Sequence, residues 1–239
     1  MNLRFLKASI EIDFQIPVDF TDLLKTTFEK GNTKNLALFS AVQFRKHHDE
    51  VSGILKEHGF TSQTSQPFRT SIEGQLLGCD SHKAALKMDL SEIDGFVYIG
   101  DGYFHPQALL LAQEFEDEIK PVLILNPVQN MCEILSREHI EKYLSKKKAT
   151  LAAFHLADQV GVFVTTKWGQ EYLQSALKLK EMYPQKTFSY FVGDNFLDAE
   201  QENFPFVQCW VNTACPRIGQ DDILRHKKPT VNLRDVWLE

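Results

Sequence analysis

One pattern of alternating segments occurs twice along the chain, and it limits the folds that the chain can adopt. Each copy has an apolar run, a charged amphipathic stretch and two further apolar runs. The apolar runs are residues 37–43, 75–80 and 95–102 in the first copy, and 161–167, 189–194 and 210–215 in the second. Such runs are typical of buried strands, whereas the amphipathic stretches have helical spacing and end at Gly59 and Pro184. Each copy therefore predicts strand, helix, strand, connection and strand.

The alternation of strands and helices favours parallel sheets with right-handed crossovers, so the predicted fold class is α/β. We expect a lead-in segment over 1–30, a first domain over 31–145 and a second over 146–239. The two domains are related by the internal repeat, and each is expected to hold a small parallel sheet flanked by helices. Ligands of open parallel sheets bind beyond the carboxyl ends of the strands, which predicts a cleft between the domains. The charge run Ser145-Lys146-Lys147-Lys148 is expected to be a solvated helix end.

The composition excludes several classes of protein. The 239 residues are 43% hydrophobic and 24% charged, as in ordinary globular proteins, and the net charge of −6 argues against broad affinity for nucleic acid. No apolar run approaches the ~18 residues of a membrane span, and no signal peptide is evident. The four cysteines form no CxxC pair, so we expect a cytoplasmic protein without a disulfide framework.

Two cysteines occur where a predicted strand ends. Cys215 ends the last apolar run and is followed by Pro216, which stops the strand, and by Arg217, whose positive charge favours the thiolate. Cys79 follows Gly78 after another apolar run. Thiolates held in this way are good ligands for a metal or an iron–sulfur cluster, so the pattern predicts Cys79 and Cys215 as metal ligands.

Other potential metal ligands favour structural roles. Cys209 lies at the far end of the last strand, about 20 Å from its carboxyl end at roughly 3.3 Å per residue. Cys132 follows the loop 126–130 and is expected to pack at the start of a helix. Adjacent helical residues point about 100° apart, so His47 and His48 are expected to form a solvent-facing pair.

Polar residues follow the predicted strands at the edge where a ligand would bind. The Gly100-Asp101-Gly102 loop can present backbone N–H groups to an anionic group, although a tight turn also explains it. His105 either belongs to the site or only begins a helix, and Asp194 either belongs to the site or caps the next helix. Arg217 has the strongest case, because its guanidinium is a bidentate donor that suits a carboxylate.

Five segments of the chain match, in order and spacing, the motifs of one enzyme family. The segments are 77–80 (LGCD), 99–106 (IGDGYFHP), 165–170 (TTKWGQ), 193–196 (GDNF) and 212–218 (NTACPRI). They resemble the diphthamide-synthesis enzymes, the 2-(3-amino-3-carboxypropyl)histidine synthases. The resemblance runs from about residue 10 to about residue 225 and covers nearly the whole chain.

The resemblance implies similar α/β domains that each give one cysteine to a 4Fe-4S cluster. In the family, the cluster binds and reductively cleaves S-adenosylmethionine, and the released 3-amino-3-carboxypropyl radical adds to a histidine of translation elongation factor 2. Cys79 resembles the ligand of the family's middle domain and Cys215 that of its last domain. The residues expected to bind S-adenosylmethionine are Gly78, Gly100, Asp101, Gly102, His105, Asp194 and Arg217.

The sequence departs from the family in its cysteines. The chain begins near the segment that leads into the middle domain, so the first domain, with its own cysteine, is expected to be missing. A cluster that keeps one iron open for substrate needs three protein thiolates. The third thiol could come from a second subunit, including a second copy in a homodimer, or from Cys209 or Cys132. A degenerate relative would instead build no cluster.

Three functions stay open at this point. The first is a cluster-bearing transferase that acts on elongation factor 2, with no direct contact with nucleic acid or membrane. The second is a non-catalytic accessory or binding subunit of the same family. The third is a small-molecule-binding α/β protein with a different metal. Because Cys79 and Cys215 are retained within whole motifs, the sequence favours the first.

Overall fold

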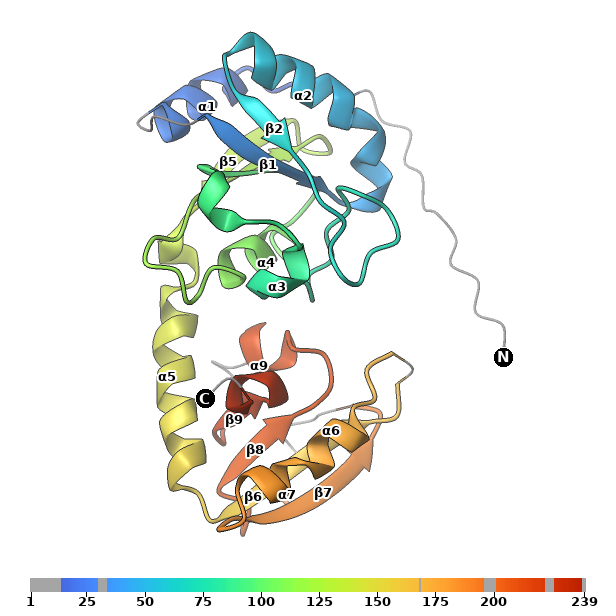
Figure 1. Ribbon diagram of the computed structural model, residues 1–239, viewed down its shortest axis with the longest axis vertical. Coiled ribbons are helices and arrows are strands. Elements are labelled where there is room, and N and C mark those ends of the chain that lie inside the picture. Colours follow the sequence, from blue (N-terminus) through green and yellow to red (C-terminus); the bar gives the residue numbers. More distant parts are fainter. Residues whose placement is uncertain (1–13, 30–33, 168, 196–200, 222–225, 238–239) are drawn as a thin grey trace, which may run out of the picture. The chain divides into compact units, whose positions relative to one another are not determined.

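The computed structural model describes residues 14–29, 34–167, 169–195, 201–221 and 226–237. The chain divides into two compact units, Met1–Ile140 (the N-terminal unit) and Glu141–Glu239 (the C-terminal unit), shown in Figure 1. Each unit has its own sheet and its own helices. Within the described ranges, no helix is both long and apolar enough to cross a membrane.

A five-stranded sheet forms the centre of the N-terminal unit, in the order β2-β1-β3-β4-β5. The strands are β1 (Asn35–Ser40), β2 (Thr61–Gln63), β3 (Gly95–Ile99), β4 (Val122–Asn126) and β5 (Met131–Leu135). The pairings are parallel except that of β5, which runs antiparallel to β4. Every residue of β3 and β4 is buried, which explains why these strands are continuous apolar runs rather than alternating ones.

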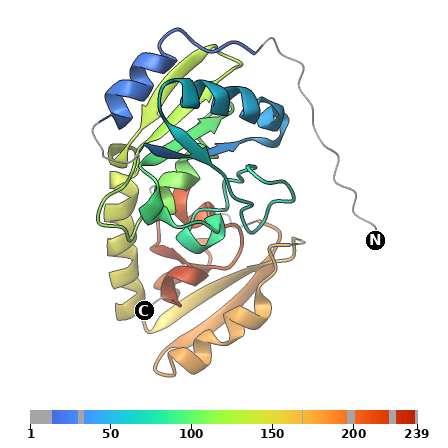
Figure 2. The ribbon, with the colours of Figure 1, turned by 45° about the horizontal axis from the view of Figure 1, so that its top comes forward.

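Helices cover both faces of this sheet. The helices α1 (Phe20–Phe28) and α2 (His48–Glu57) lie on one face, and α3 (Lys83–Leu86) and α4 (Pro106–Leu111) lie on the other (Figures 1 and 2). Short 3₁₀ helices occur at Val42–His47, Leu90–Glu92 and Arg137–His139. The chain leaves β1 toward β2 on one side and β3 toward β4 on the other. Because both crossovers are right-handed, their helices lie on opposite faces of the sheet.

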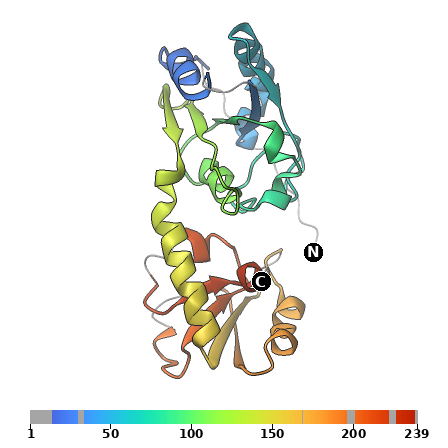
Figure 3. The same ribbon diagram turned by 60° about the vertical axis from the view of Figure 1, so that its left-hand side comes forward.

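A four-stranded parallel sheet in the order β7-β6-β8-β9 forms the centre of the C-terminal unit. The strands are β6 (Gln159–Thr165), β7 (Thr187–Gly193), β8 (Cys209–Asn212) and β9 (Thr230–Asn232). The helices given within the described residues are α5 (Glu141–Leu156), α6 (Leu173–Leu177), α7 (Leu179–Met182) and α9 (Ile218–Asp221), and a 3₁₀ helix spans Leu233–Val236. The long helix α5 runs alongside this sheet (Figure 3).

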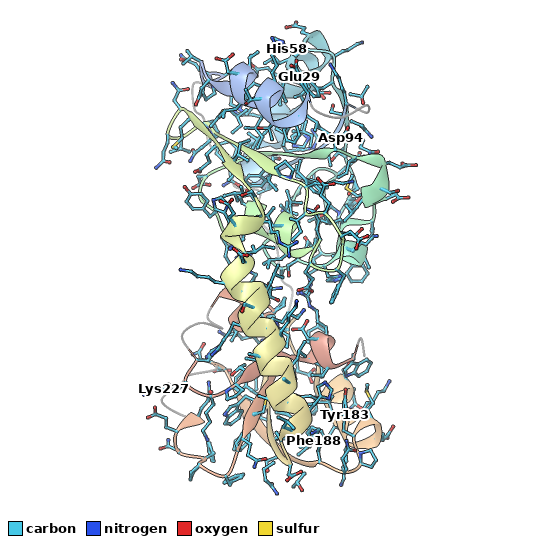
Figure 4. All side chains as sticks on the ribbon, turned by 90° about the vertical axis from the view of Figure 1, so that its left-hand side faces the viewer. Glu29, His58, Asp94, Tyr183, Phe188 and Lys227 are labelled. Atoms are coloured by element: carbon cyan, nitrogen blue, oxygen red, sulfur yellow. The ribbon has the colours of Figure 1, made fainter. Side chains whose placement is uncertain are left out.

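The main core of the C-terminal unit lies between its sheet and the helices α5, α6 and α7. Val162 from β6, Phe154 from α5 and Ala176 from α6 are fully buried in it. Tyr183 and Phe188, labelled in Figure 4, pack against the same cluster. The Tyr183 hydroxyl also donates a hydrogen bond of 2.7 Å to the carbonyl of Val236, so the crossover before β7 is tied to the 3₁₀ helix after β9.

The two sheets share one topology, which confirms the predicted α/β fold with its internal repeat. The strands β2, β1, β3 and β4 take the same places in the first sheet as β7, β6, β8 and β9 in the second. The registers also agree: Leu36 pairs with Gly95 in one sheet as Val160 pairs with Cys209 in the other.

The second strand of the N-terminal unit differs from the prediction. It is Thr61–Gln63, a short polar strand at the edge of the sheet. The predicted strand at 75–80 adds only one bridge, between Gln75 and Ser40, and continues as a loop. A partly exposed edge strand of this length needs no apolar residues, so its sequence carries no strand pattern.

The charge run at 145–148 lies within α5 rather than at a helix end. Lys147 is 6% exposed, and its Nζ lies 2.9 Å from Asp235 Oδ1. The expectation of a solvated run was wrong for Lys147, because Asp235, near the other end of the unit's sequence, supplies a partner carboxylate. A buried charge persists when such a partner is supplied.

Gly161→Ala should destabilise the protein, because a Cβ there would lie 2.7 Å from the Trp210 ring and 2.9 Å from Val207. Overpacking of a buried site costs about 1–3 kcal/mol. Gly53→Ala is the control, since a Cβ on this exposed residue of α2 meets nothing within 4 Å. It should stabilise the protein by about 0.5–1 kcal/mol. Urea unfolding measures both changes, and effects of the same sign would contradict the packing argument.

Candidate functional site

The carboxyl ends of the parallel strands in each unit lie at one edge of its sheet. In the N-terminal unit, β1 leads to β2 on one side and β3 leads to β4 on the other. In the C-terminal unit, β6 and β8 diverge in the same way. Neighbouring strands whose connections diverge form the switch point at which α/β sheets bind ligands. The loops that follow these strands are therefore the candidate site residues of each unit.

Cys79 lies in a tight turn at this edge of the N-terminal unit. The N–H of Leu77 donates to Asp80 Oδ2 at 3.2 Å, and the N–H of Asp80 donates to the Leu77 carbonyl at 3.0 Å. Asp80 is fully buried, and this burial raises the pKa of its carboxyl group. The N–H of Leu76 donates to the Ser40 carbonyl at 2.9 Å and anchors the turn to β1. Cys79 itself is half-buried.

Gly78 brings the Cys79 turn against the loop that follows β3. A Cβ on Gly78 would lie 2.2 Å from the Phe104 ring, so the ring occupies the space of a side chain. The Phe104 ring meets the His105 ring edge-on, with centroids 5.4 Å apart. His105 also precedes α4, although its side chain does not cap that helix. Gly78, Cys79 and His105 therefore come from two adjoining loops.

The Gly100-Asp101-Gly102 loop begins directly after β3. Gly100 is buried, and a Cβ there would lie 2.6 Å from the Tyr98 hydroxyl. The Gly100 N–H donates to the Leu125 carbonyl at 3.0 Å, so it is not available to an anionic ligand. Asp101 and Gly102 are exposed, and Gly102 has a φ of +66°, which suits glycine. The loop thus offers the Asp101 carboxylate at the edge of the sheet.

Cys215 follows β8 at the carboxyl edge of the C-terminal sheet. Its carbonyl accepts the Ile218 N–H at 3.0 Å, which closes a turn with Pro216 at the second position. Cys215 is half-buried. Arg217 is only 4% exposed, so a carboxylate that met this guanidinium would do so in a largely water-free setting.

Asp194 belongs to a link between the loops that follow β6 and β7. The Thr166 hydroxyl donates to Asp194 Oδ1, and Lys167 Nζ donates to Asn195 Oδ1 at 2.8 Å. Asp194 is exposed. The helix that Asp194 was alternatively expected to cap would fall on residues 196–200, outside the described residues.

The other two cysteines are buried within strands. Cys209 lies in β8 and Cys132 in β5, so Cys132 is not at a helix start as expected. Burial raises the pKa of each thiol to about 12. Such thiols carry little thiolate near neutral pH, whereas a metal ligand is a thiolate.

Among the residues that the structure describes, no group of three His, Cys, Asp or Glu side chains is positioned to hold a metal ion. Each unit instead offers one half-buried thiol at the carboxyl edge of its sheet, Cys79 in one and Cys215 in the other. Thiolates are the ordinary protein ligands of an iron–sulfur cluster, so the donor chemistry fits such a cluster. Each unit by itself thus offers one candidate ligand.

Sequence reasoning missed two asparagines beside Cys215. Asn212 donates to the Cys215 carbonyl and Asn232 to the Pro216 carbonyl, both at 2.9 Å. Asn232 lies in β9, and only the pairing of β9 with β8 brings it to the turn. No local pattern in the sequence could have identified it.

His48 is buried, so the expectation of a solvent-facing histidine pair was wrong. His48 is 3% exposed, and its Nε2 lies 2.8 Å from Ser40 Oγ at the carboxyl end of β1. Burial, followed by the nearby charge of Arg45, lowers the pKa of His48 to about 3. His48 begins α2, and its side chain points toward the sheet. The angle between adjacent helical residues does not tell which of the two faces the sheet.

The sequence model of the diphthamide synthesis protein family matches residues 5–237. The chain belongs to this family. The match extends over both units and includes the segments around Cys79 and Cys215.

Curated relatives carry the name 2-(3-amino-3-carboxypropyl)histidine synthase. The relative from Methanocaldococcus jannaschii is 29% identical over 204 residues, which cover 84% of this chain and 50% of the relative. The relative from Pyrococcus horikoshii is 28% identical over 190 residues, with coverage of 78% and 52%. A human relative named subunit 1 of this synthase is 26% identical over 231 residues, with coverage of 90% and 48%. The chain therefore spans about half the length of these relatives.

Two crystal structures of Dph2 from Pyrococcus horikoshii share the fold of this chain. One has a TM-score of 0.73 at 24% identity and covers 95% of this chain and 62% of its own. The other, described as containing a 4Fe-4S cluster, has a TM-score of 0.70 at 23% identity, with coverage of 94% and 67%. These likenesses establish a common fold.

We expect the free energy of unfolding to fall as the pH drops from 6.5 toward 3, because unfolded His48 binds a proton that folded His48 does not. The contribution is at most about 1.4 kcal/mol for each pH unit in this window. His48→Gln should reduce the slope, whereas His155→Gln, at an exposed position of α5, should preserve it. Urea unfolding at a series of pH values measures the slope. A parent-like slope in His48→Gln would disprove the assignment.

Proposed function

We propose that this protein is an iron–sulfur protein of diphthamide synthesis in which Cys79 and Cys215 bind a 4Fe-4S cluster. The observation that carries the proposal is the setting of the two thiols. Each is half-buried in a turn at the carboxyl edge of its sheet, and each lies in the region that matches the family.

When bound, such a cluster would supply the electron for reductive cleavage of S-adenosylmethionine, whose 3-amino-3-carboxypropyl group would pass to a histidine of translation elongation factor 2. The names of the curated relatives describe this histidine modification and support the proposal. The chain's own residues would hold the thiolates, orient the substrate and limit the access of water. A substrate of this kind implies a cytoplasmic location.

Substrate binding is assigned to the polar residues at the same edges. Arg217 suits the carboxylate of the methionine group, since a desolvated guanidinium forms strong bidentate hydrogen bonds. The exposed Asp101 carboxylate suits the positively charged ammonium or sulfonium group. His105 would contribute its imidazole, which contacts the Phe104 ring that packs against the Cys79 turn. Asp194 would act through the loop that it holds together with Thr166.

The third thiolate would come from a second chain. A cluster with one open iron needs three protein thiolates, and this chain has two in suitable settings. Cys132 and Cys209 are disfavoured because burial raises the pKa of each thiol to about 12. The second chain would be another copy of this protein or a different subunit, and the word "subunit" in the human relative's name supports a shared site.

A non-catalytic accessory subunit of the same family is the second candidate. It is favoured by the cysteines, of which only Cys79 and Cys215 lie at the carboxyl edge of a sheet, whereas a cluster with one open iron needs three protein thiolates. Such a subunit would dock on elongation factor 2 or on a complete synthase without cleaving S-adenosylmethionine itself.

Iron binding tests the proposed function. After anaerobic reconstitution with iron and sulfide, we expect the parent chain to bind both, and Cys79→Ala and Cys215→Ala each to lose most of them. Cys132→Ala should bind as the parent does, because its thiol is buried in β5. The measurements are iron and sulfide content per chain and the visible absorbance spectrum.

Iron binding that survives both Cys79→Ala and Cys215→Ala would contradict the assignment of the ligands. A parent chain that takes up no iron, alone or mixed with a complete synthase, would instead favour the accessory subunit.

A further inference from the structure

Two asparagine side chains hold the turn that contains Cys215. Asn212, the last residue of β8, donates from Nδ2 to the Cys215 carbonyl at 2.9 Å and accepts the Ala214 N–H on Oδ1 at 3.0 Å. Asn232, the last residue of β9, donates from Nδ2 to the Pro216 carbonyl at 2.9 Å. The second Nδ2 proton of Asn212 is donated to Asn232 Oδ1 at 2.8 Å. We call Asn212 and Asn232 the amide clamp.

The amide clamp follows from the register of the sheet. Asn212 and Asn232 are paired residues of β8 and β9, so their side chains emerge side by side where both strands end. They are 1% and 2% exposed. Amides buried this deeply need hydrogen-bond partners. Here each Oδ1 and Nδ2 atom of the two side chains forms a hydrogen bond with the turn or with the other asparagine.

Gly219 gives the amide clamp the space that it occupies. A Cβ on Gly219 would lie 2.4 Å from Asn232 Oδ1 and 2.8 Å from its Nδ2. Any side chain at this position of α9 would therefore displace the Asn232 amide. The position of the Asn232 amide in β9 thus depends on the absence of a side chain at Gly219 in α9.

We propose that the amide clamp is a positioning device for the Cys215 thiol. It fixes the Ala214 N–H and the carbonyls of Cys215 and Pro216, so it holds the backbone on both sides of the Cys215 Cα and fixes the direction of its Cβ. A metal-binding thiolate needs such support, because small displacements of a ligand weaken the site. The inference rests on the proposed role of Cys215 as a cluster ligand.

The alkylation rate of Cys215 in the iron-free chain tests this inference. In Asn232→Ala, we expect iodoacetamide to modify Cys215 roughly five-fold faster, the effect of about one lost hydrogen bond, while Cys79 keeps its rate. Thr230→Ala is the matched control, because Thr230 is 1% exposed in the same strand but its hydroxyl donates to the Lys228 carbonyl. Mass spectrometry of the peptides follows both cysteines in one sample.

Gly219→Ala provides a second, independent variant should Asn232→Ala fail to fold. The added Cβ displaces the Asn232 amide, so the Cys215 rate should again rise, whereas Gly53→Ala should change neither cysteine. A Cys215 rate within about two-fold of the parent in the folded variants would overturn the inference. An equal rise at Cys79, or in Thr230→Ala, would also overturn it by showing general loosening.

The two proposals fail in distinguishable ways. If the parent chain takes up no iron, the proposed function fails, and the alkylation rates still decide whether the amide clamp controls Cys215. If the parent binds iron but the Cys215 rate is unchanged in both variants, the clamp is wrong and the cluster assignment stands.

Discussion

Parallel pairing of the first and third strands governs the arrangement of each unit. β1 pairs with β3 and β6 with β8, and nearly every residue of these four strands is buried. Because parallel strands need crossovers, the carboxyl ends of the parallel strands in a unit come to one edge of the sheet, and the chain leaves that edge in two directions. The loops that carry the cysteines become a candidate site only through this geometry.

The internal repeat ends where the thiol-bearing loops begin. Cys79 follows Gln75, which bridges to Ser40 at the end of β1, whereas Cys215 lies shortly after the end of β8. The Cys79 turn is closed locally by the Asp80 carboxylate. The Cys215 turn is held by amides from two neighbouring strands. Two units with one topology thus present their cysteines from different strand ends and by different hydrogen bonds.

Close contacts at small residues connect these loops to the rest of each unit. Gly78 admits the Phe104 ring, which joins the Cys79 turn to the loop after β3, and Gly219 admits the Asn232 amide. A glycine in a loop is easily interpreted as a turn residue, as it was for the 100–102 loop. At Gly78 and Gly219, the missing side chain leaves space for the Phe104 ring and the Asn232 amide. The sequence does not reveal which side chain fills that space.

The sequence by itself determined the α/β class, the repeat and the loops that follow the strands, because apolar runs and helical spacing are local properties of the chain. It also singled out Cys79 and Cys215, since a thiol at the end of an apolar run is visible without a partner. Only the tertiary structure decided that His48 and Lys147 are buried, that Arg217 is covered and that Asn232 holds the Cys215 turn. Each of these depends on strand order or on a side chain distant in sequence, and burial and hydrogen bonding are set by whichever neighbours the fold supplies.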